Sequence, residues 1–530
     1  MFRNHLPRLV QRASRIAQGY RNRLLEIAPI MISVASDPLV CDADINVNKH
    51  QSASLHLTLP NRLSYGLGGA VYAVKEAAYV MFVLLFYTQV LGLSGTATGI
   101  VLSLSLVWDA VSDPMVGSWS DRYKSRWGRR HPFMIYATVP MGLGFIALFA
   151  PPDFVLDSQL WLAAWLLGCS LWIRTALTFF SIPHYTLVAE ISQDYHERSA
   201  LMGQRTAFLF LTTLLLPSAS LYFLFDEGAG GDGRFVASNY VTYGWLSALV
   251  VWITATACIA GTWKFIGHTR VDPARAPSTP GFAGLWLDFL STFQNRNFRN
   301  VLGYDLGATA SYGITIALNI IFWTYFWELQ ATEMGLLLGL SVLIAVPIAV
   351  VFLKTASRRM PKHDIVKWAV VVMLLDLSWP YLLRWLDLIP DNGDPVIFAI
   401  LVVQNAVFMS FFILRIVAIA SLTADLTDEH EAETGLRQEG GFYAVLQFTT
   451  KLGGAVGPLY GGFALDLVGL EEGMRPGAVE QSALDALVLI GAAAIVPLML
   501  MAFFFTFRFS MTEERLRQIQ ALIARRRQDQ

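Results

Sequence analysis

The chain contains about twelve long apolar runs, and these runs restrict its fold more than any other feature of the sequence. A membrane-spanning helix needs roughly 20 mostly apolar residues. The runs are continuous, whereas the strands of a membrane barrel are short and alternating, so we expect an all-α membrane protein. Composition agrees, because 55% of the 530 residues are hydrophobic and 15% are charged. The predicted spans are 64–88, 95–119, 132–151, 158–187, 203–224, 241–266, 299–327, 333–353, 365–387, 394–422, 440–468 and 484–508.

Lysine and arginine gather in three places that predict the orientation of the chain. Connections rich in these residues stay on the cytoplasmic side of a membrane. With an even number of spans, both termini are then expected to be cytoplasmic, in a multi-pass protein of the plasma (inner) membrane. The basic residues concerned are Arg122, Lys124, Arg126, Arg129 and Arg130, then Lys354, Arg358, Arg359 and Lys362, and finally Arg515, Arg517, Arg525, Arg526 and Arg527.

An internal repeat divides the chain into two halves. The stretches "AEISQDYHERSALMGQ" (189–204) and "ADLTDEHEAETGLRQE" (424–439) share small, acidic and aliphatic residues in the same order. Each follows an even-numbered predicted span. Two six-helix halves related by an axis along the membrane normal explain this, and they are the plan of the major facilitator superfamily.

The repeat also sets the expected organisation of the chain. Residues 1–60 are strongly basic at their start, which is typical of a membrane-surface helix or an organelle transit peptide. The alternatives are a flexible tail or a start codon assigned too early. The full expected division is 1–60, a cytoplasmic N-terminal extension; 61–268, the first half; 269–297, a central cytoplasmic linker; 298–508, the second half; and 509–530, a cytoplasmic tail.

Two aspartates lie inside the second predicted span. Asp109 and Asp113 are four residues apart, so they share one helix face about one turn apart. An ionisable group in the membrane costs ~2.5–3.5 kcal/mol on insertion scales, which makes each one a functional candidate. Together they can bind a proton or a sodium ion. The alternative is that they pair with a buried base, namely Arg174 of the fourth span or Lys451 of the eleventh.

A polar face on the first span is a candidate for solute binding. Tyr72, Glu76 and Tyr79 follow helical spacing, and a carboxylate between tyrosines can bind a hydroxylated solute. The alternative is an internal ion pair of Glu76 with Lys75 or Arg174. Four further charges lie nearer to predicted span ends, where snorkelling to the membrane surface explains them: Asp305, Asp376, Arg384 and Arg415.

The basic loop after the second span is a candidate cytoplasmic gate. Its glycine permits tight packing, and its charges can latch the two halves through ion pairs. Acidic and basic residues of the repeated stretches would complete such a network, although membrane topology alone also explains the basic loop. The residues concerned are Gly117, Asp121, Arg122, Arg126, Gly128, Arg129 and Arg130, with Glu190, Arg198, Asp425, Arg437 and Glu439.

At "DAVSDPMVGSWSDRYKSRWGRRHPF" the sequence resembles the glycoside–pentoside–hexuronide:cation symporters of the major facilitator superfamily. More distant members include the animal lysophospholipid carriers. The likeness runs from about 60 to 510 and includes "YHERSALMGQR" and "TTKLGGAVG". It implies that Asp109, Asp113 and the neighbouring Thr178 bind the coupling cation and that Lys451 faces the cavity. It also implies gate roles for Arg198, Asp425 and Arg437.

Departures from this family bear on the solute. Where the melibiose carrier has sugar-binding acids on its first and fourth helices, this chain has Ala73 and Ser181. Glu76, one turn beyond Ala73, can replace the first acid, and Tyr185 stands where that carrier presents a tryptophan. Losing the fourth-helix acid removes a carboxylate near the sodium site, so sodium coupling is less favoured than proton coupling.

These observations predict a secondary active transporter that couples H+ or Na+ to movement of a sugar or glycoside by alternating access. The alternatives are a carrier of lysolipids or other amphipathic metabolites and a non-transporting receptor or scaffold. No enzyme motif, cofactor, metal site or nucleic-acid patch is predicted. The partners we expect are a small-molecule solute, a coupling cation and the bilayer, with the protein acting as a monomer. Cys41, Cys169 and Cys258 lack the spacing of a zinc site.

Overall fold

The computed structural model describes residues 57–528 except 124, 193, 227–231, 267–292, 294, 357–359, 435–438, 471–472 and 510–512. The expected N-terminal extension (1–60) and central linker (269–297) lie almost wholly outside the described residues. Every regular element within the described ranges is a helix. The all-α prediction is therefore confirmed for the part of the chain that can be described.

The described ranges contain twelve long helices, and each overlaps one of the predicted spans. Eleven spans in this part of the chain are long and apolar enough to cross a membrane, and α14 is the remaining long helix. The first six are α2 (Leu59–Ala77, continued by the π-helical turns η2, Ala78–Val83, and η3, Phe86–Val90), α3 (Gly95–Arg122), α4 (His131–Phe149), α6 (Gln159–Ile191), α7 (Tyr195–Phe223) and α8 (Ala237–Thr262). The second six are α10 (Arg296–Ile321, continued by the π-helical η6, Phe322–Phe326), α11 (Ala331–Ala356), α12 (Lys362–Trp385), α13 (Pro395–Thr434), α14 (Glu439–Val468) and α15 (Gln481–Thr506).

The first helix of each half ends in the same way. Both α2 and α10 pass into a π-helical turn, η3 and η6, before the chain leaves the helix. Beyond η3, the Leu93 N–H donates to the Tyr87 carbonyl over 2.8 Å. Beyond η6, the Leu329 N–H donates to the Trp323 carbonyl, also over 2.8 Å. These paired endings are separated along the chain by the same interval, within one residue, as the two repeated polar stretches.

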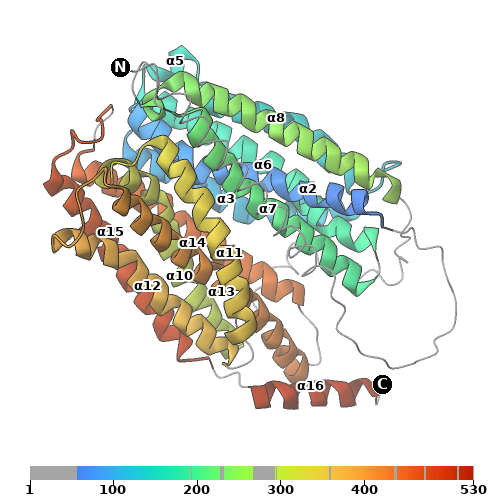
Figure 1. Ribbon diagram of the computed structural model, residues 1–530. Helices are drawn as coiled ribbons and strands as arrows, with labels where there is room; N and C mark the ends of the chain where they lie inside the picture. Colours follow the sequence, from blue (N-terminus) through green and yellow to red (C-terminus); the bar gives the residue numbers. More distant parts are fainter. Residues whose placement is uncertain are drawn as a thin grey trace, which may run out of the picture. The chain divides into compact units, whose positions relative to one another are not determined.

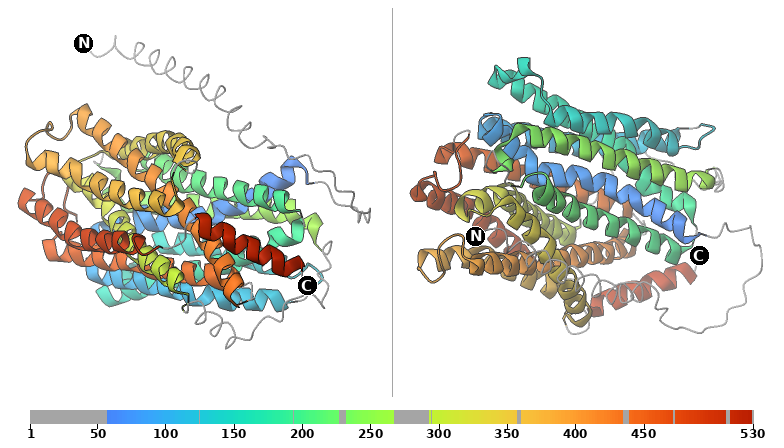
Figure 2. Two further views of the ribbon diagram at one scale, coloured as in Figure 1. Left: turned by 90° about the horizontal axis from the view of Figure 1, so that it is seen from below. Right: turned by 45° about the horizontal axis from the view of Figure 1, so that its top comes forward.

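The two sets of six helices form two halves that lie side by side (Figures 1 and 2). In Figure 1 and in the right view of Figure 2, the blue-to-green helices α2–α8 stay together, and the yellow-to-red helices α10–α15 form a second group. The halves meet where α3 packs on α14 and α7 packs on α11. We call the end at which α3 begins the Gly95 end, and the end that carries the loop 123–130 the basic end.

A carboxylate from the second half caps a helix of the first half at the Gly95 end. Asp466, near the end of α14, accepts hydrogen bonds from the backbone N–H groups of Gly95 (2.6 Å) and Thr96 (2.7 Å). These are two of the N–H groups that the first turn of a helix leaves without a helical partner. Close by, a Cβ added to Gly462 would lie 1.9 Å from the Gly95 carbonyl oxygen. Glycine is therefore required for α3 and α14 to approach so closely.

The π-helical turns add a second set of contacts between the halves at the Gly95 end. The Tyr325 hydroxyl of η6 donates to Gln89 Oε1 of η3 over 2.9 Å. The Gly473 N–H donates to the Gln89 carbonyl over 3.1 Å. On the other pair of helices, Ser218 of α7 donates to the Gly335 carbonyl of α11 over 2.5 Å. The Gly95 end is thus closed by hydrogen bonds between the halves.

Among the helices of the described ranges, α13 extends furthest beyond its predicted span. The sequence predicts an end near residue 422, whereas α13 continues to Thr434. Its polar extension packs against α16 (Glu513–Gln528), where Arg515 pairs with Glu429 at 2.8 Å. Ile519 and Ile523 of α16 are both 8% exposed. The predicted span ended too early because hydropathy measures only the apolar part of a helix, and here ion pairing stabilises the rest.

Candidate functional site

The most deeply buried ion pair of the first half joins α3 to α6. Arg174 Nη1 donates to Asp109 Oδ2 over 2.8 Å, and Arg174 Nε donates to Ser105 Oγ over 2.9 Å. Asp109 is 4% exposed and Arg174 2% exposed. The guanidinium also lies 4.9 Å from the centre of the Tyr79 ring. Because each charge has a close partner, this pair fixes α3 against α6.

A second ion pair joins the two halves. Lys451 of α14 pairs with Asp113 of α3, and the Thr178 hydroxyl of α6 donates to the other Asp113 oxygen over 2.9 Å. Lys451 Nζ also donates to the Asp109 carbonyl over 3.3 Å. The side chains of Asp113 and Lys451 are 28% and 18% exposed, so this pair is reachable where the Asp109 pair is not. The Asp109 carboxylate is therefore buried, whereas the Asp113 carboxylate, one helical turn further along α3, is accessible.

The polar face of α2 carries a third pair. Lys75 pairs with its neighbour Glu76, and the Lys75 ammonium lies 4.5 Å from the centre of the Tyr72 ring. The Lys75 side chain is 4% exposed, whereas that of Glu76 is 32% exposed. The Glu76 carboxylate is thus held in place by a buried base while part of it stays accessible. Ala73, one turn earlier, is fully buried and cannot contact a solute.

The remaining predicted cavity residues lie further along α6, toward the basic end. Ser181 is half-buried, and Tyr185 is 52% exposed. The Arg205 guanidinium of α7 lies 5.3 Å from the centre of the Tyr185 ring. These two residues lie two to three helical turns from Arg174, so they are not part of the three ion pairs.

Four of the predicted gate residues make contacts within their own half, namely Arg129, Glu190, Arg198 and Asp425. Arg129 Nε donates to Glu190 over 2.5 Å in the first half, and Lys362 pairs with Asp425 at 2.7 Å in the second. Arg198 Nε donates to the Ser192 carbonyl over 2.6 Å. These contacts hold the basic end of each half, whereas the hydrogen bonds described above join the halves at the Gly95 end.

The other gate residues take different positions. Arg126 is exposed and lies 5.2 Å from the Trp127 ring. A Cβ added to Gly117 would meet Ile182 at an ordinary 3.6 Å, so close packing does not require glycine there. Outside the described positions lie Arg437 and the side chains of Asp121, Arg122 and Glu439.

Sequence reasoning missed a buried polar cluster in the second half. Asp305 of α10 accepts hydrogen bonds from Thr450 (2.7 Å) and Thr309 (3.3 Å), and Arg415 of α13 lies 3.9 Å away. Arg415 is 5% exposed, and its Nε and Nη1 atoms have no hydrogen-bond partner. Snorkelling is therefore the wrong explanation for Asp305 and Arg415, and also for Asp376, which is 5% exposed. The available signal was a charge within a predicted span.

The described residues offer no group of three or more His, Cys, Asp or Glu side chains that could hold a metal ion. Cys169 and Cys258 are buried as free thiols in α6 and α8. The candidate site consists instead of three carboxylates and three bases at the junction of the halves.

Comparison with known proteins identifies the family. Residues 64–513 match the model of the family described as MFS/sugar transport protein. A putative glycoside/cation symporter of Escherichia coli, YagG, is 24% identical over 78% of this chain and 84% of its own. An uncharacterized symporter of Synechocystis, sll1374, is 33% identical over 177 residues, which is 33% of this chain and 32% of that symporter.

A solved structure shows the same fold. A mutant form of the nucleoside transporter NupG superposes with a TM-score of 0.57 and 14% identity, covering 85% of this chain and 99% of that protein. At this identity the likeness concerns the fold alone. Because the family model covers most of its length, the chain belongs to the MFS/sugar transport protein family and is a multi-pass membrane transporter of the major facilitator type, not an enzyme.

Proposed function

We propose that this chain is a symporter that moves a small hydroxylated solute, a sugar or a glycoside, together with a proton or a sodium ion. The observation that carries the proposal is the ion pair between Lys451 and Asp113. It links the two halves near the middle of α3 and α14, where a site can be exposed to each side of the membrane in turn.

Asp113 has the role of the coupling carboxylate because it is the accessible one. Its side chain is 28% exposed, and Thr178 and Ser112 bring hydroxyl oxygens that suit a hard cation. Asp109 is enclosed by Arg174 and Ser105. A proton or a sodium ion that binds Asp113 therefore competes with Lys451 for this carboxylate.

Competition at Asp113 couples cation to solute. Removing one partner from an ion pair leaves an uncompensated charge, which costs about 3–5 kcal/mol in a fully buried pair and less in this partly exposed one. The freed Lys451 ammonium lowers this cost by donating hydrogen bonds to a solute oxygen. Cation and solute then favour each other's binding by the same free energy, as linkage requires.

Glu76 and its tyrosines support a hydroxylated solute. The Glu76 carboxylate can accept hydrogen bonds from sugar hydroxyls, which are stronger when the acceptor is charged. Tyr72 lies beside it on α2, and Tyr79 lies one turn further. Aromatic rings present flat apolar faces to a sugar ring, and their hydroxyls bond at its edge.

The orientation follows from the basic residues. Loops rich in lysine and arginine remain in the cytoplasm, which makes the basic end the cytoplasmic end. The Gly95 end is then the outer end, and the hydrogen bonds of Asp466 and Gln89 close the site to the outside. On this orientation, hydrogen bonds between the halves at the outer end support an inward-facing state in our proposal.

The test begins with binding to the purified protein. Melting temperatures are measured with free sugars, glycosides and lysophospholipids, each with and without sodium at two pH values. A ligand at 100 times its dissociation constant stabilises a protein by about 2.7 kcal/mol. Stabilisation by a sugar that depends on sodium names sodium as the coupling ion, and dependence on pH alone names the proton. If lysophospholipids alone raise the melting temperature, the proposed solute is a lipid and not a sugar.

Flux through vesicles then tests Asp113. With the stabilising solute, Asp113→Asn should abolish uptake driven by a cation gradient while exchange of solute continues. Asp153→Asn, in the short helix α5 (Asp153–Leu156), removes a carboxylate far from the site and should leave driven uptake unchanged. Driven uptake at the parent rate in Asp113→Asn rejects the coupling role, and absence of any flux from the parent protein indicates a non-transporting receptor.

A further inference from the structure

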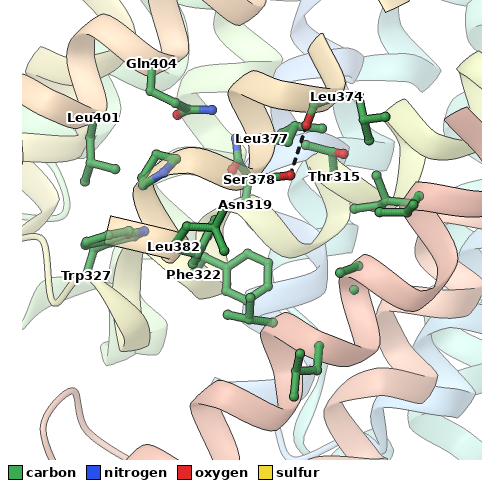
Figure 3. A pocket seen from close by; sticks show the side chains of 18 of the residues that line it. Thr315, Asn319, Phe322, Trp327, Leu374, Leu377, Ser378, Leu382, Leu401 and Gln404 are labelled. Atoms are coloured by element: carbon green, nitrogen blue, oxygen red, sulfur yellow. Dashed lines mark hydrogen bonds between the residues drawn. The ribbon is translucent and has the colours of Figure 1, made fainter. Parts of the chain in front are cut away.

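A cavity lies inside the second half, away from the three ion pairs. It has a volume of about 310 Å³ and is lined by α10, η6, α12, α13 and α15. Figure 3 shows side chains of α10, η6, α12 and α13 around this space. Its residues come from the parts of these helices nearest the Gly95 end, for example Asn319, Leu382 and Leu401. We call it the lateral pocket.

The lateral pocket opens between α12 and α15, which lie at the edge of the bundle. Leu382 and Trp385 of α12 are 50% and 40% exposed, and Leu489 of α15 is 57% exposed. All three belong to membrane-spanning helices and also line the pocket. Apolar side chains exposed on a spanning helix face hydrocarbon, so the medium at this opening is the bilayer and not water.

The chemistry of the walls fits an amphiphile. Phe322, Trp323 and Tyr381 give the interior aromatic surfaces. Its polar groups are the amides of Asn319 and Gln404 and the hydroxyls of Thr315 and Ser378. An apolar space of this kind gains dispersion contacts when it is filled by a chain of methylene groups. Its volume lies near the lower limit of the ~300–1,000 Å³ typical of ligand pockets, which suits one acyl chain.

One wall of the lateral pocket belongs to the closure of the Gly95 end. Phe322 and Trp323 line the pocket and begin the π-helical turn η6. Tyr325 of the same turn bonds to Gln89 of the first half and to the Met474 carbonyl (3.0 Å). A molecule in the pocket therefore contacts η6, the turn whose Tyr325 bonds to the first half.

We propose that the lateral pocket binds one acyl chain of a bilayer lipid and that this chain stabilises η6 in the position that closes the Gly95 end. The solute site at the junction of the halves is separate, so the proposal does not depend on the identity of the transported solute.

Photolabelling tests the site. The full chain is reconstituted into phosphatidylcholine vesicles that contain a small fraction of phosphatidylcholine with a diazirine in one acyl chain. We expect labels in 374–385 and 488–496 that excess lysophosphatidylcholine competes away. Labels on the outer helix surfaces, which contact bulk lipid, should resist competition. Labelling of the two segments that no competitor reduces overturns the proposal.

Two neighbouring alanines of α15 provide a matched pair of variants. Ala492 lines the pocket, whereas Ala493 is exposed on the same helix and does not. Ala492→Phe should lower competable labelling by about tenfold, equivalent to ~1.4 kcal/mol of binding free energy. Ala493→Phe should leave it unchanged. Equal labelling in both variants overturns the assignment, and competition in the parent protein remains decisive if Ala492→Phe does not fold.

Spin labels test the effect on closure. Leu156, the last residue of α5, and Leu388, in the loop after α12, are 43% and 67% exposed in the first and second halves at the Gly95 end. Labels on cysteines at these positions report the separation of the halves by double electron–electron resonance in detergent. Adding lysophosphatidylcholine should increase the short-distance population in the parent and in Ala493→Phe but not in Ala492→Phe. A response that is the same in all three proteins rejects the link to closure.

Discussion

Asp466 offers the sharpest perturbation of the closed Gly95 end. Its carboxylate accepts two backbone N–H groups at the start of α3, at 2.6 and 2.7 Å. Replacing a capping side chain with alanine typically costs ~0.5–2 kcal/mol, and Asp466 caps a helix of the opposite half. The cost therefore falls on the closed state alone. A loss of about 1–2 kcal/mol shifts the equilibrium toward an open Gly95 end by roughly 5- to 30-fold.

The spin-label pair at Leu156 and Leu388 measures this shift, in a chain whose three native cysteines are replaced. Asp466→Ala should transfer population from short to long distances. Asp485→Ala is the matched control, because Asp485 accepts from Trp385 (2.9 Å) within the second half. If Asp466→Ala and the parent give the same distribution, the capping bonds do not contribute to closure, and the close packing of the glycines in α3 and α14 maintains it.

Three further substitutions have expected outcomes. Asp109→Asn should lower the melting temperature in detergent, because it leaves the Arg174 guanidinium buried without its counter-charge at a cost of about 3–5 kcal/mol; a stable variant would show that water reaches the pair. Gly457→Ala should lose about 1–3 kcal/mol in the same assay, since its Cβ would lie 2.3 Å from the backbone of α10, whereas Gly454→Ala meets nothing within 4 Å and should be neutral. Thr178→Val should weaken cation affinity in the melting screen while leaving the protein folded, and an unchanged affinity would remove this hydroxyl from the cation site.

The helices were predictable because membrane insertion depends on length and hydropathy. The predicted span 95–119 became α3 (Gly95–Arg122), and 440–468 became α14 (Glu439–Val468). The predicted helix end was wrong where a helix continues beyond its apolar residues. The polar end of α13 depends on Glu429 meeting Arg515 of a helix outside the membrane spans, and a hydropathy scan contains no information about that contact.

The candidate site was predictable in its residue types but not in its pairing. Asp109 and Asp113 occupy one face of one helix, and the sequence names Arg174 and Lys451 as alternative partners for them. Which aspartate is enclosed and which is reachable depends on how α6 and α14 are rotated against α3. Likewise Asp466 stands near a span end and becomes a contact between halves only through the approach of α14 to α3.

The charge balance of the site has an electrical consequence. Asp109, Asp113 and Glu76 carry three negative charges, and Arg174, Lys451 and Lys75 carry three positive ones. Without cargo these six groups sum to zero, so the returning carrier is insensitive to voltage in this region. With one coupling cation and a neutral sugar, the proposed loaded form carries a single positive charge. Moving that charge across the membrane gains about 2.3 kcal/mol per 100 mV. A resting potential, negative inside, would then favour the step that moves cation and solute inward. The return of the carrier without cargo would not depend on the potential.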